Sequence, residues 1–435
     1  MTIDHLYKLY KESPFVCTDT RQIVRDSLFF ALKGERFNAN KLAGSALEAG
    51  ARWAVVDDPD VVTDDRYILV DDVLTTLQAL ARHHRQQLTI PFIGITGTNG
   101  KTTTKELVYA VLSQQYKTYA TKGNLNNHIG VPLTLLAIDD SVEMAVIEMG
   151  ANHQSEIGFL CGMAQPTHGL ITNVGKAHLE GFGSFEGVKK AKGELYDFLK
   201  AHDGVLFLQG DNAHLVEMES GRSVRKIFRY GFSASNDIVG ELAQANPFLT
   251  VRWREKEGDA GYPVETHLTG SYNTENILAA VAVGRFFGME AALINAGIEA
   301  YHPTNNRSQI VETDRNTVIA DYYNANASSM AAALENIAVI NAERKVIILG
   351  DMFEMGDETY EEHRRIVEKA TALGVERMLF IGKAFFEHRC PQGQGEFYRT
   401  TDEAKEQLRQ RPVENSTVLL KASRGMAFES LVELL

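Results

Sequence analysis

The sequence is poor in cysteine: only Cys17, Cys161 and Cys390 occur among its 435 residues, and they lie far apart. Their number is odd and no Cys-x-x-Cys pair exists, so the sequence supports neither a disulfide framework nor a cysteine-bound zinc site. We therefore expect the protein to reside in a reducing compartment, the cytoplasm.

Long apolar runs are also missing. The N-terminal residues, MTIDHLYKLYKE, are charged from the fourth residue and contain no apolar core of the kind found in signal peptides. No uninterrupted apolar stretch approaches the length of about 20 residues that a helix needs to cross a bilayer. We expect a soluble, cytoplasmic protein without membrane insertion.

Basic residues are outnumbered, with 44 Lys and Arg against 57 Asp and Glu and a formal net charge of −13. The field of such a protein repels a polyanion, which argues against general nucleic-acid binding. A small anion such as a nucleotide can still be held by a local cluster of backbone N–H groups, lysines and a metal ion. The content of 44% hydrophobic and 23% charged residues is ordinary for a globular protein, and it excludes a disordered chain, a fibre or a coiled coil.

Short β-branched runs alternate with longer amphipathic segments, a pattern typical of α/β architecture. A soft prior of about 150 residues per domain predicts three domains. We predict a smaller α/β N-terminal domain over residues 1–87, a central domain with a doubly wound, mostly parallel sheet over residues 88–304, and a Rossmann-like C-terminal domain over residues 305–435.

Two local expectations go beyond this alternation. We expect helical stretches before and between the runs "WAVVDD", from Trp53, and "YILVDD", from Tyr67. Residues 224–270 have a more antiparallel pattern, which predicts an added β ribbon or small sheet inside the central domain.

The segment FIGITGTNGKTTTKELV, residues 92–108, carries the strongest functional signal. An apolar strand leads into a glycine-rich turn and then into an amphipathic helix, so that backbone N–H groups and the helix dipole can cradle phosphate oxygens. Lys101 can bridge the terminal phosphates, and a hydroxyl from Thr102 or Thr103 can coordinate Mg²⁺. The residues expected to bind the nucleotide phosphates are Gly97, Thr98, Asn99, Gly100, Lys101, Thr102 and Thr103.

This P-loop is shorter than the standard GxxxxGK[ST] pattern, because Ile95 stands where the first glycine is expected. A glycine turn that opens an ordinary helix is the alternative interpretation. The loop alone also leaves open whether the protein is an ATPase, a GTPase, a kinase or a ligase.

Two further residues follow predicted parallel strands. Glu148 lies near the end of "MAVIEMG" and His178 lies just after "LITNVG", at the carboxyl ends of strands where ligands of α/β sheets bind. Each residue alone is explained as well by a capping or solvated side chain. Beside a P-loop, the carboxylate and the imidazole together predict a Mg²⁺ shell.

Ten ordered motifs resemble the ATP-dependent Mur ligases of bacterial cell-wall synthesis, and they span nearly the whole chain. They are "GITGTNGKTTTK", "GNLNNHIGVPLTLL", "IEMGANHQSEI", "NVGKAHLEGFGS", "AKGELYDFL", "GSYNTENILAA", "NNRSQ", "DYYNANASSM", "GDMFEMG" and "LLKASRGM". The resemblance implies a ligase that uses ATP and Mg²⁺ to join D-alanyl-D-alanine to UDP-N-acetylmuramoyl-tripeptide through an acyl phosphate. We also expect the protein to be a monomer.

The resemblance implies how the substrates are shared among the domains. The N-terminal domain would hold the UDP group through "TDTR", and the loop "GNLNNHIG" would line the channel for the muramoyl peptide. The implied substrate contacts are Thr18, Asp19, Thr20, Arg21, Asn124, Asn126 and Asn127. Taken alone, the same residues fit a capping aspartate with a surface arginine, and a tight loop rich in Asn and Gly.

The resemblance also implies roles around the nucleotide. Asn273 and Asn276, one helical turn apart, would contact adenine; Arg307 would reach the phosphates and Asp321 the ribose. Lys192 in "AKGEL" would be carbamylated, which turns a cation into an oxygen ligand for the metal, whereas a plain helix lysine is the alternative. The implied catalytic residues are Lys101, Lys192, His178 and Arg307, and the implied metal shell is Thr102, Glu148, His178 and Lys192.

Three alternatives remain open. A sister ligase that adds a single amino acid shares the loop and the metal residues, although the DNPR-like motif of the diaminopimelate-adding type is absent from this sequence. A folylpolyglutamate synthetase-like ligase shares the architecture but not the signature "GNLNNHIG". A nucleotide-dependent binding or switch protein would lack ligase activity altogether.

Overall fold

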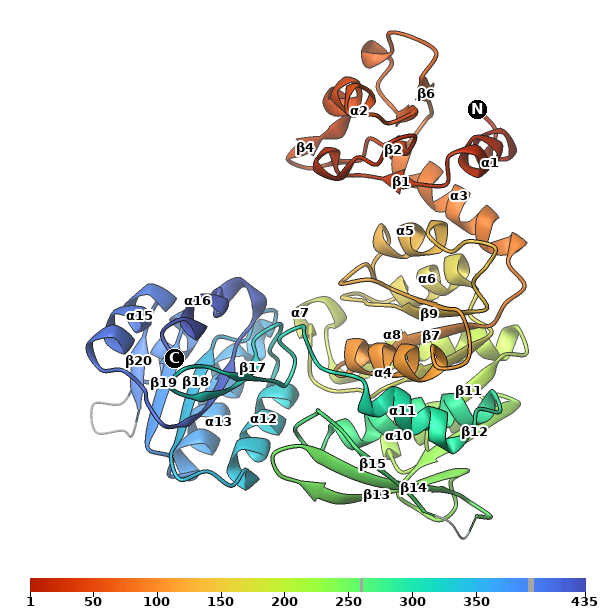
Figure 1. The fold of residues 1–435 in the computed structure, drawn as a ribbon. Coiled ribbons are helices and arrows are strands. Elements are labelled where there is room, and N and C mark those ends of the chain that lie inside the picture. Colours follow the sequence, from red (N-terminus) through yellow and green to blue (C-terminus); the bar gives the residue numbers. More distant parts are fainter. Residues whose placement is uncertain (259–260, 390–394) are drawn as a thin grey trace.

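The computed structural model describes residues 1–258, 261–389 and 395–435, and Figure 1 shows three groups of strands and helices that follow one another along the chain. Three main sheets, of four, nine and six strands, form the centres of these groups. The predicted three-part α/β fold is thereby confirmed. Cys17 and Cys161 are free, whereas Cys390 lies outside the described residues. Among the described residues, no helix combines the length and the apolar character needed to span a membrane.

The N-terminal sheet is small and parallel, with the strand order β1-β2-β5-β6. Its strands are β1 (Val16–Cys17), β2 (Leu28–Phe30), β5 (Trp53–Val56) and β6 (Tyr67–Leu69), and a hairpin of β3 (Lys33–Gly34) and β4 (Phe37–Asn38) lies beside it. The helices are α1 (Ile3–Glu12), α2 (Ala43–Glu48) and α3 (Val73–Gln87), with 3₁₀ turns η1 (Thr20–Gln22), η2 (Ala39–Leu42) and η3 (Pro59–Val61). The prediction of a helix between β5 and β6 is wrong. Only the 3₁₀ turn η3 forms in this connection, because the connection is too short for a helix flanked by turns.

The central sheet has the order β15-β14-β13-β12-β11-β10-β7-β9-β8. Its strands are β7 (Phe92–Thr96), β8 (Thr118–Ala120), β9 (Met144–Glu148), β10 (His168–Ile171), β11 (Val205–Gln209), β12 (Lys226–Gly231), β13 (Ile238–Ala245), β14 (Leu249–Glu255) and β15 (Tyr262–Glu265). All neighbours from β8 to β13 are parallel, and β13, β14 and β15 are antiparallel. The antiparallel ribbon predicted within residues 224–270 is therefore present, and it extends the central sheet.

Both faces of the central sheet are covered by helices, as the nearly continuous apolar strands require. Met144 and Val146 of β9 pack in one hydrophobic cluster, whereas Ala145 and Ile147 pack in another on the opposite face. Helices α4 (Lys101–Leu112), α10 (Asn273–Phe286) and α11 (Ala291–Glu299) belong to the first face. Helices α5 (Gly130–Leu136), α6 (Glu156–Ala164) and α8 (Phe185–Ala201) belong to the second, and α7 (Leu179–Phe182) and α9 (Ala213–Ser220) complete this part of the chain.

The order of the central strands positions the site. The chain leaves β7 toward β9 and β8 on one side and later returns to β10 on the other, so β7 lies at a topological switch point. A crevice forms at such a point beyond the carboxyl ends of the strands. The P-loop follows β7, and Glu148 is the last residue of β9. The two motifs thus meet at the edge where a ligand is expected.

The C-terminal sheet has the order β16-β17-β21-β18-β19-β20 and is parallel apart from β16. Its strands are β16 (Gln309–Glu312), β17 (Thr317–Asp321), β18 (Lys345–Gly350), β19 (Arg377–Ile381), β20 (Glu396–Tyr398) and β21 (Thr417–Lys421). The helices are α12 (Ala327–Val339), α13 (Thr359–Ala372), α14 (Lys383–Phe386), α15 (Thr401–Gln410) and α16 (Glu429–Val432), with 3₁₀ turns η4 (Gly356–Glu358) and η5 (Arg424–Met426). Ile347 and Leu349 of β18 face the core under α12 and α13, and Val346 and Ile348 face the core under α15 and α16. Helices on both faces give the expected Rossmann-like arrangement.

Candidate active site

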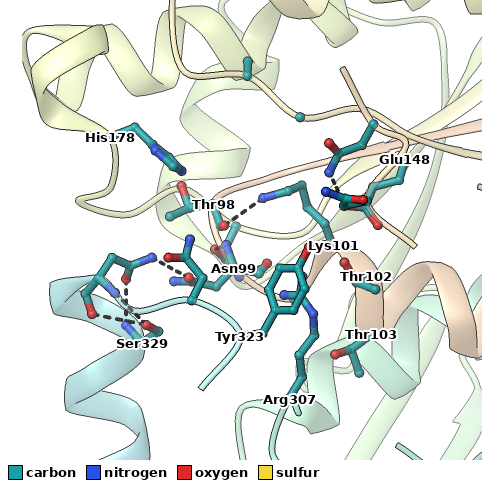
Figure 2. A pocket seen from close by; sticks show the side chains of 18 of the residues that line it. Thr98, Asn99, Lys101, Thr102, Thr103, Glu148, His178, Arg307, Tyr323 and Ser329 are labelled. Carbon is teal, nitrogen blue, oxygen red and sulfur yellow. Dashed lines mark hydrogen bonds between the residues drawn. The ribbon is translucent and has the colours of Figure 1, made fainter. Parts of the chain in front are cut away.

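A cavity of about 530 Å³ lies between the carboxyl edge of the central sheet and the start of α12 in the C-terminal unit (Figure 2). Fifteen of the site residues that were predicted from the sequence line this cavity. They are Thr98, Asn99, Gly100, Lys101, Thr102, Thr103, Asn124, Asn126, Asn127, Glu148, His178, Asn273, Asn276, Arg307 and Asp321. These residues come from distant parts of the chain, and the structure brings them to one place.

The P-loop needs both of its glycines. Gly97 has a φ of +148°, and a Cβ atom there would lie 2.0 Å from Thr172 Oγ1. Gly100 has a φ of +77°, and its Cβ would lie 2.7 Å from Asn276 Oδ1. Only glycine fits this backbone. Gly97 does not itself line the cavity, so it shapes the loop instead of facing a ligand there.

Lys101 is the first residue of α4, and its side chain folds back over the loop. Its Nζ donates hydrogen bonds to the carbonyl oxygens of Gly97, at 2.8 Å, and Thr98, at 3.0 Å. Burial lowers the pKa of Lys101 to about 8, an effect opposed by the Glu148 carboxylate and reinforced by the Arg307 guanidinium. An anion bound in the cavity would therefore stabilise the charged form of Lys101.

Glu148 is held by the loop that follows β8. Its Oε1 accepts a hydrogen bond of 2.7 Å from Asn126 Nδ2, and its backbone N–H donates to Thr121 Oγ1 at 3.0 Å. Its other carboxylate oxygen, Oε2, is buried and has no hydrogen-bond partner among the described residues. A buried, unpartnered carboxylate oxygen is costly, and a cation would satisfy it.

His178 precedes α7 with a φ of 51°, and its Nδ1 pairs with the Glu354 carboxylate of the C-terminal unit. Burial lowers the pKa of His178, and the Glu354 charge opposes this effect. Lys176, in the same loop, forms ion pairs with Glu358 at 2.7 Å and Glu362 at 3.2 Å. The loop before α7 is thus docked on the C-terminal unit. No cluster of three or more His, Cys, Asp or Glu side chains suited to a metal occurs in the described ranges.

Lys192 lies on α8, is 2% exposed, and does not line the cavity. Its Nζ donates a long hydrogen bond of 3.4 Å to the carbonyl oxygen of Ala151, a residue of the cavity wall. Burial lowers the pKa of Lys192 to about 7; the Lys101 ammonium lowers it further, whereas Glu156 and Glu194 oppose the shift. A large fraction of Lys192 is therefore a neutral amine near neutral pH.

The residues expected around adenine and ribose already have partners. Asn276 Nδ2 donates to Asn273 Oδ1 at 2.8 Å, and Asn276 Oδ1 accepts from Thr104 Oγ1 at 3.0 Å. Asp321 pairs with the buried Lys421 at 2.7 Å. These bonds hold the asparagine pair against the P-loop helix and fix the carboxylate at the end of β17.

The P-loop also contacts the C-terminal unit directly. Asn99 Nδ2 donates to Ser328 Oγ at 2.9 Å, and Asn99 Oδ1 accepts from Asn326 Nδ2 at 2.8 Å (Figure 2). Asn326 is the N-cap of α12 and forms a capping box with Ser329. The start of α12 is therefore held against the loop that follows β7.

Several residues that line the cavity were not predicted from the sequence as part of the site. Among them are Asn173, which accepts a hydrogen bond of 3.0 Å from the backbone N–H of Asn99, and Tyr323, Ser328 and Ser329. Asn173 follows β10 at the same sheet edge as Glu148, so its position after a strand is a usable signal. The other three lie inside the motif "DYYNANASSM", where the local sequence does not distinguish a residue of the site from a residue that caps the helix.

The predicted uridine-nucleotide contacts do not line the cavity. Thr18, Asp19, Thr20 and Arg21 lie in the N-terminal unit, at the start of the 3₁₀ turn η1. The Arg21 guanidinium pairs with the Asp19 carboxylate at 2.6 Å and lowers the pKa of Asp19 to about 2. The Arg21 side chain is 86% exposed. Residues 18–21 thus lie at the surface of the N-terminal unit, outside the cavity.

Two family models match the chain. The Mur ligase middle domain matches residues 95–284, and the Mur ligase glutamate ligase domain matches residues 306–424. Together they span most of the central and C-terminal units, including the P-loop and the motif after β17. The chain belongs to the Mur ligase family.

Within this family, the chain is 36% identical to the UDP-N-acetylmuramoyl-tripeptide–D-alanyl-D-alanine ligase of Escherichia coli, over 97% of this chain and 93% of that one. A crystal structure of MurF from Acinetobacter baumannii is similar with a TM-score of 0.86 and 28% identity, covering 98% of this chain and 97% of that chain. A crystal structure of MurF ligase from Thermotoga maritima in complex with ADP shares the fold, with a TM-score of 0.84 at 24% identity and 97% coverage of both chains.

Proposed function

We propose that the protein is an ATP-dependent ligase that joins D-alanyl-D-alanine to UDP-N-acetylmuramoyl-tripeptide, a step of peptidoglycan precursor synthesis. The observation that carries this proposal is the single cavity lined by the P-loop, by Glu148, by Arg307 and by the "GNLNNHIG" loop. It offers phosphate-binding groups beside a part of the cavity wall that contains three asparagines. The Escherichia coli relative, which is 36% identical over 97% of the chain, is named for the same activity.

In the proposed reaction, the terminal carboxylate of the tripeptide attacks the γ-phosphorus of ATP, which gives an acyl phosphate and ADP. The amine of D-alanyl-D-alanine then attacks the acyl carbon, and inorganic phosphate leaves. Lys101 and Arg307 would neutralise the negative charge on the transferred phosphoryl group, and the protein would otherwise act by positioning the reactants.

Water must be kept away from the acyl phosphate. The hydrogen bonds that Asn99 forms with Asn326 and Ser328, and the ion pairs of Lys176, join the central and C-terminal units around the cavity. We propose that the same contacts exclude water when substrates are bound.

Mg²⁺ fits the residues present, because Glu148 Oε2 is a buried oxygen without a hydrogen-bond partner in the part of the chain that the structure describes. We propose that Thr102, Glu148, His178 and a carbamylated Lys192 hold it, and that it supplies charge neutralisation at the phosphates when bound. The lowered pKa of Lys192 supports the carbamate, since only a neutral amine reacts with CO₂.

The remaining groups complete the proposed substrate sites. Residues 18–21 would hold the UDP group, residues 124–127 the muramoyl peptide, Asn273 and Asn276 adenine, and Asp321 ribose. We propose that the domains divide at residues 87/88 and 304/305, between α3 and β7 and between α11 and β16. A UDP-linked substrate and ATP are both available in the cytoplasm, where we expect the protein to act as a monomer.

Alanine at Glu148 or at His178 should raise the Mg²⁺ concentration needed for half-maximal activity, because each change deletes a group beside the phosphates. The measurement is a Mg²⁺ titration of phosphate release. Glu241→Ala, at an exposed position of β13, is the matched control and should leave the titration unchanged. Identical Mg²⁺ curves for both site variants and the wild type would assign structural roles to Glu148 and His178.

Coupling between ATP cleavage and amine addition separates a ligase from a nucleotide-dependent switch. Phosphate release should require UDP-N-acetylmuramoyl-tripeptide and D-alanyl-D-alanine together. Equal release from ATP alone would contradict the proposed function, whereas release that needs the tripeptide and a single amino acid would favour a sister ligase.

A further inference from the structure

Arg307 has an unusual environment for an arginine in a polar cavity. Its Nε is buried without a hydrogen-bond partner, and the side chain forms no ion pair within the described parts of the chain. Instead, its Cζ lies 3.8 Å from the centroid of the Tyr323 ring. Figure 2 shows the guanidinium beside this ring at the cavity wall. The contact with Tyr323 is thus the main interaction that defines where the Arg307 charge lies.

The backbone places these two side chains opposite each other. The carbonyl oxygen of Asn306 accepts a hydrogen bond of 3.3 Å from the Tyr323 N–H, and the Ser308 N–H donates to Asp321 Oδ1 at 3.3 Å. The residues on both sides of Arg307 are therefore bonded to the end of β17. Tyr272, at the start of α10, bonds Ser308 Oγ at 2.6 Å and ties the same segment to the central unit.

The phenol end of Tyr323 has a partner of its own. Arg424 Nη1 donates to the Tyr323 hydroxyl at 3.5 Å, and the Arg424 Cζ lies 5.3 Å from the ring centroid. The first distance is at the long limit of a hydrogen bond, so it adds little energy. The aromatic face, and not the hydroxyl, is the group that Arg307 contacts.

An aromatic face holds a guanidinium differently from a carboxylate. A carboxylate would neutralise the charge and occupy the N–H edges, whereas a ring attracts the cation through its face and leaves those edges free for phosphate oxygens. The Arg307 guanidinium needs a contact that holds it in place, because Lys101 lines the same cavity and two cations repel each other. Without the ring, the long side chain would occupy more conformations and point away from the phosphates more often.

We propose that Tyr323 is a positioning residue that holds the Arg307 guanidinium toward the phosphates of bound ATP. This inference rests on the proposed ATP site, and it assigns to Tyr323 an effect that acts only through Arg307. The ring is required, and the hydroxyl is dispensable. The effect of Tyr323 should therefore be measurable both in the affinity for the nucleotide and in the turnover rate.

The test uses five proteins: the wild type, Tyr323→Phe, Tyr323→Leu, Arg307→Ala and the double variant Tyr323→Leu/Arg307→Ala. Dissociation constants for Mg·ATP are measured by calorimetry, and kcat by phosphate release. Tyr323→Leu should weaken ATP binding or lower kcat by about tenfold, the effect of a partly desolvated cation–π contact. Tyr323→Phe should stay within about twofold of the wild type, since it keeps the face. In the Arg307→Ala background, Tyr323→Leu should have no further effect.

Thermal unfolding of each variant separates a loss of fold from a loss of positioning. A folded Tyr323→Leu with wild-type affinity and kcat would overturn the proposal. So would a Tyr323→Phe as impaired as Tyr323→Leu, or a full tenfold loss that persists without Arg307. If the wild type itself fails to bind Mg·ATP, the proposed function is contradicted, and this result is distinct from the other three.

Discussion

Replacing Lys101 by alanine should abolish measurable turnover, a loss of about a thousandfold or more, while the protein stays folded. The ammonium of Lys101 lies across the P-loop, where its nearest partners are the carbonyl oxygens of Gly97 and Thr98. With ATP bound, the same charge would face the phosphates in a site shielded from water, where electrostatic stabilisation is strong. Arg307 does not take over this role, because it approaches from the strands of the C-terminal sheet.

Two variants distinguish the charge of Lys101 from its packing. Lys101→Met keeps the aliphatic stem and lacks the charge, so it should lose turnover as severely as Lys101→Ala. Thermal unfolding and circular dichroism report the fold, and phosphate release reports kcat. A folded Lys101→Met with kcat near that of the wild type would remove the assignment of this loop as a catalytic P-loop.

Lys192→Ala should also reduce activity severely if the lysine is carbamylated, because the change deletes an anionic oxygen ligand beside the metal. Acetate or formate at high concentration should restore part of the rate, since either supplies similar oxygens in the vacated space. The rescue should be incomplete because the added carboxylate is not covalently positioned. Lys190→Ala, at an exposed position of the same helix, is the matched control and should retain activity without rescue.

The pattern of rescue separates three states of Lys192. Rescue by a small amine and not by a carboxylate would mean that Lys192 acts as an ammonium, and a fully active variant would mean that it is structural. Because burial lowers the pKa of Lys192 to about 7, the neutral amine increases as pH rises through that value. Reactivation of CO₂-depleted wild-type enzyme by bicarbonate should therefore be greater at about pH 8 than at about pH 6.

The parts of the site that the sequence predicted are those governed by local patterns. The P-loop is recognisable because Gly97 and Gly100 must adopt backbone angles that other residues avoid. Glu148 is the last residue of an apolar strand, and the edge where parallel strands end is a general ligand site. The alternation of strands and helices likewise predicted the central and C-terminal sheets.

The parts that the sequence did not predict depend on contacts between distant residues. The burial of Lys192 beneath Ala151 follows from how α8 packs on the sheet, and a helical pattern shows only that one face is apolar. The hydrogen bonds that Asn99 forms with Asn326 and Ser328 depend on how the two units dock. A tyrosine in a turn after a strand gives no local sign that an arginine stacks on it.

The docking of the C-terminal unit on the central unit has one consequence for the charges of the cavity. Arg307 precedes β16 and Tyr323 follows β17, two strands of the C-terminal sheet, whereas Lys101 and Glu148 lie in α4 and β9 of the central unit. The cavity therefore contains its full set of charges only when the units are together, as they are here through Asn99 and Lys176. In the proposed reaction, such an arrangement would delay catalysis until the reactants are enclosed, which would protect the acyl phosphate from water.

Identification of the product is the decisive test of the proposed ligase activity. The purified protein is incubated with Mg·ATP, UDP-N-acetylmuramoyl-tripeptide and an equimolar mixture of D-alanyl-D-alanine, D-alanine, L-lysine and diaminopimelate, and the products are identified by mass spectrometry. We predict one nucleotide-linked product, the tripeptide extended by D-alanyl-D-alanine, formed in equal amount with ADP and phosphate. A product extended by a single amino acid, or ADP formed without any extended product, would contradict the proposed function.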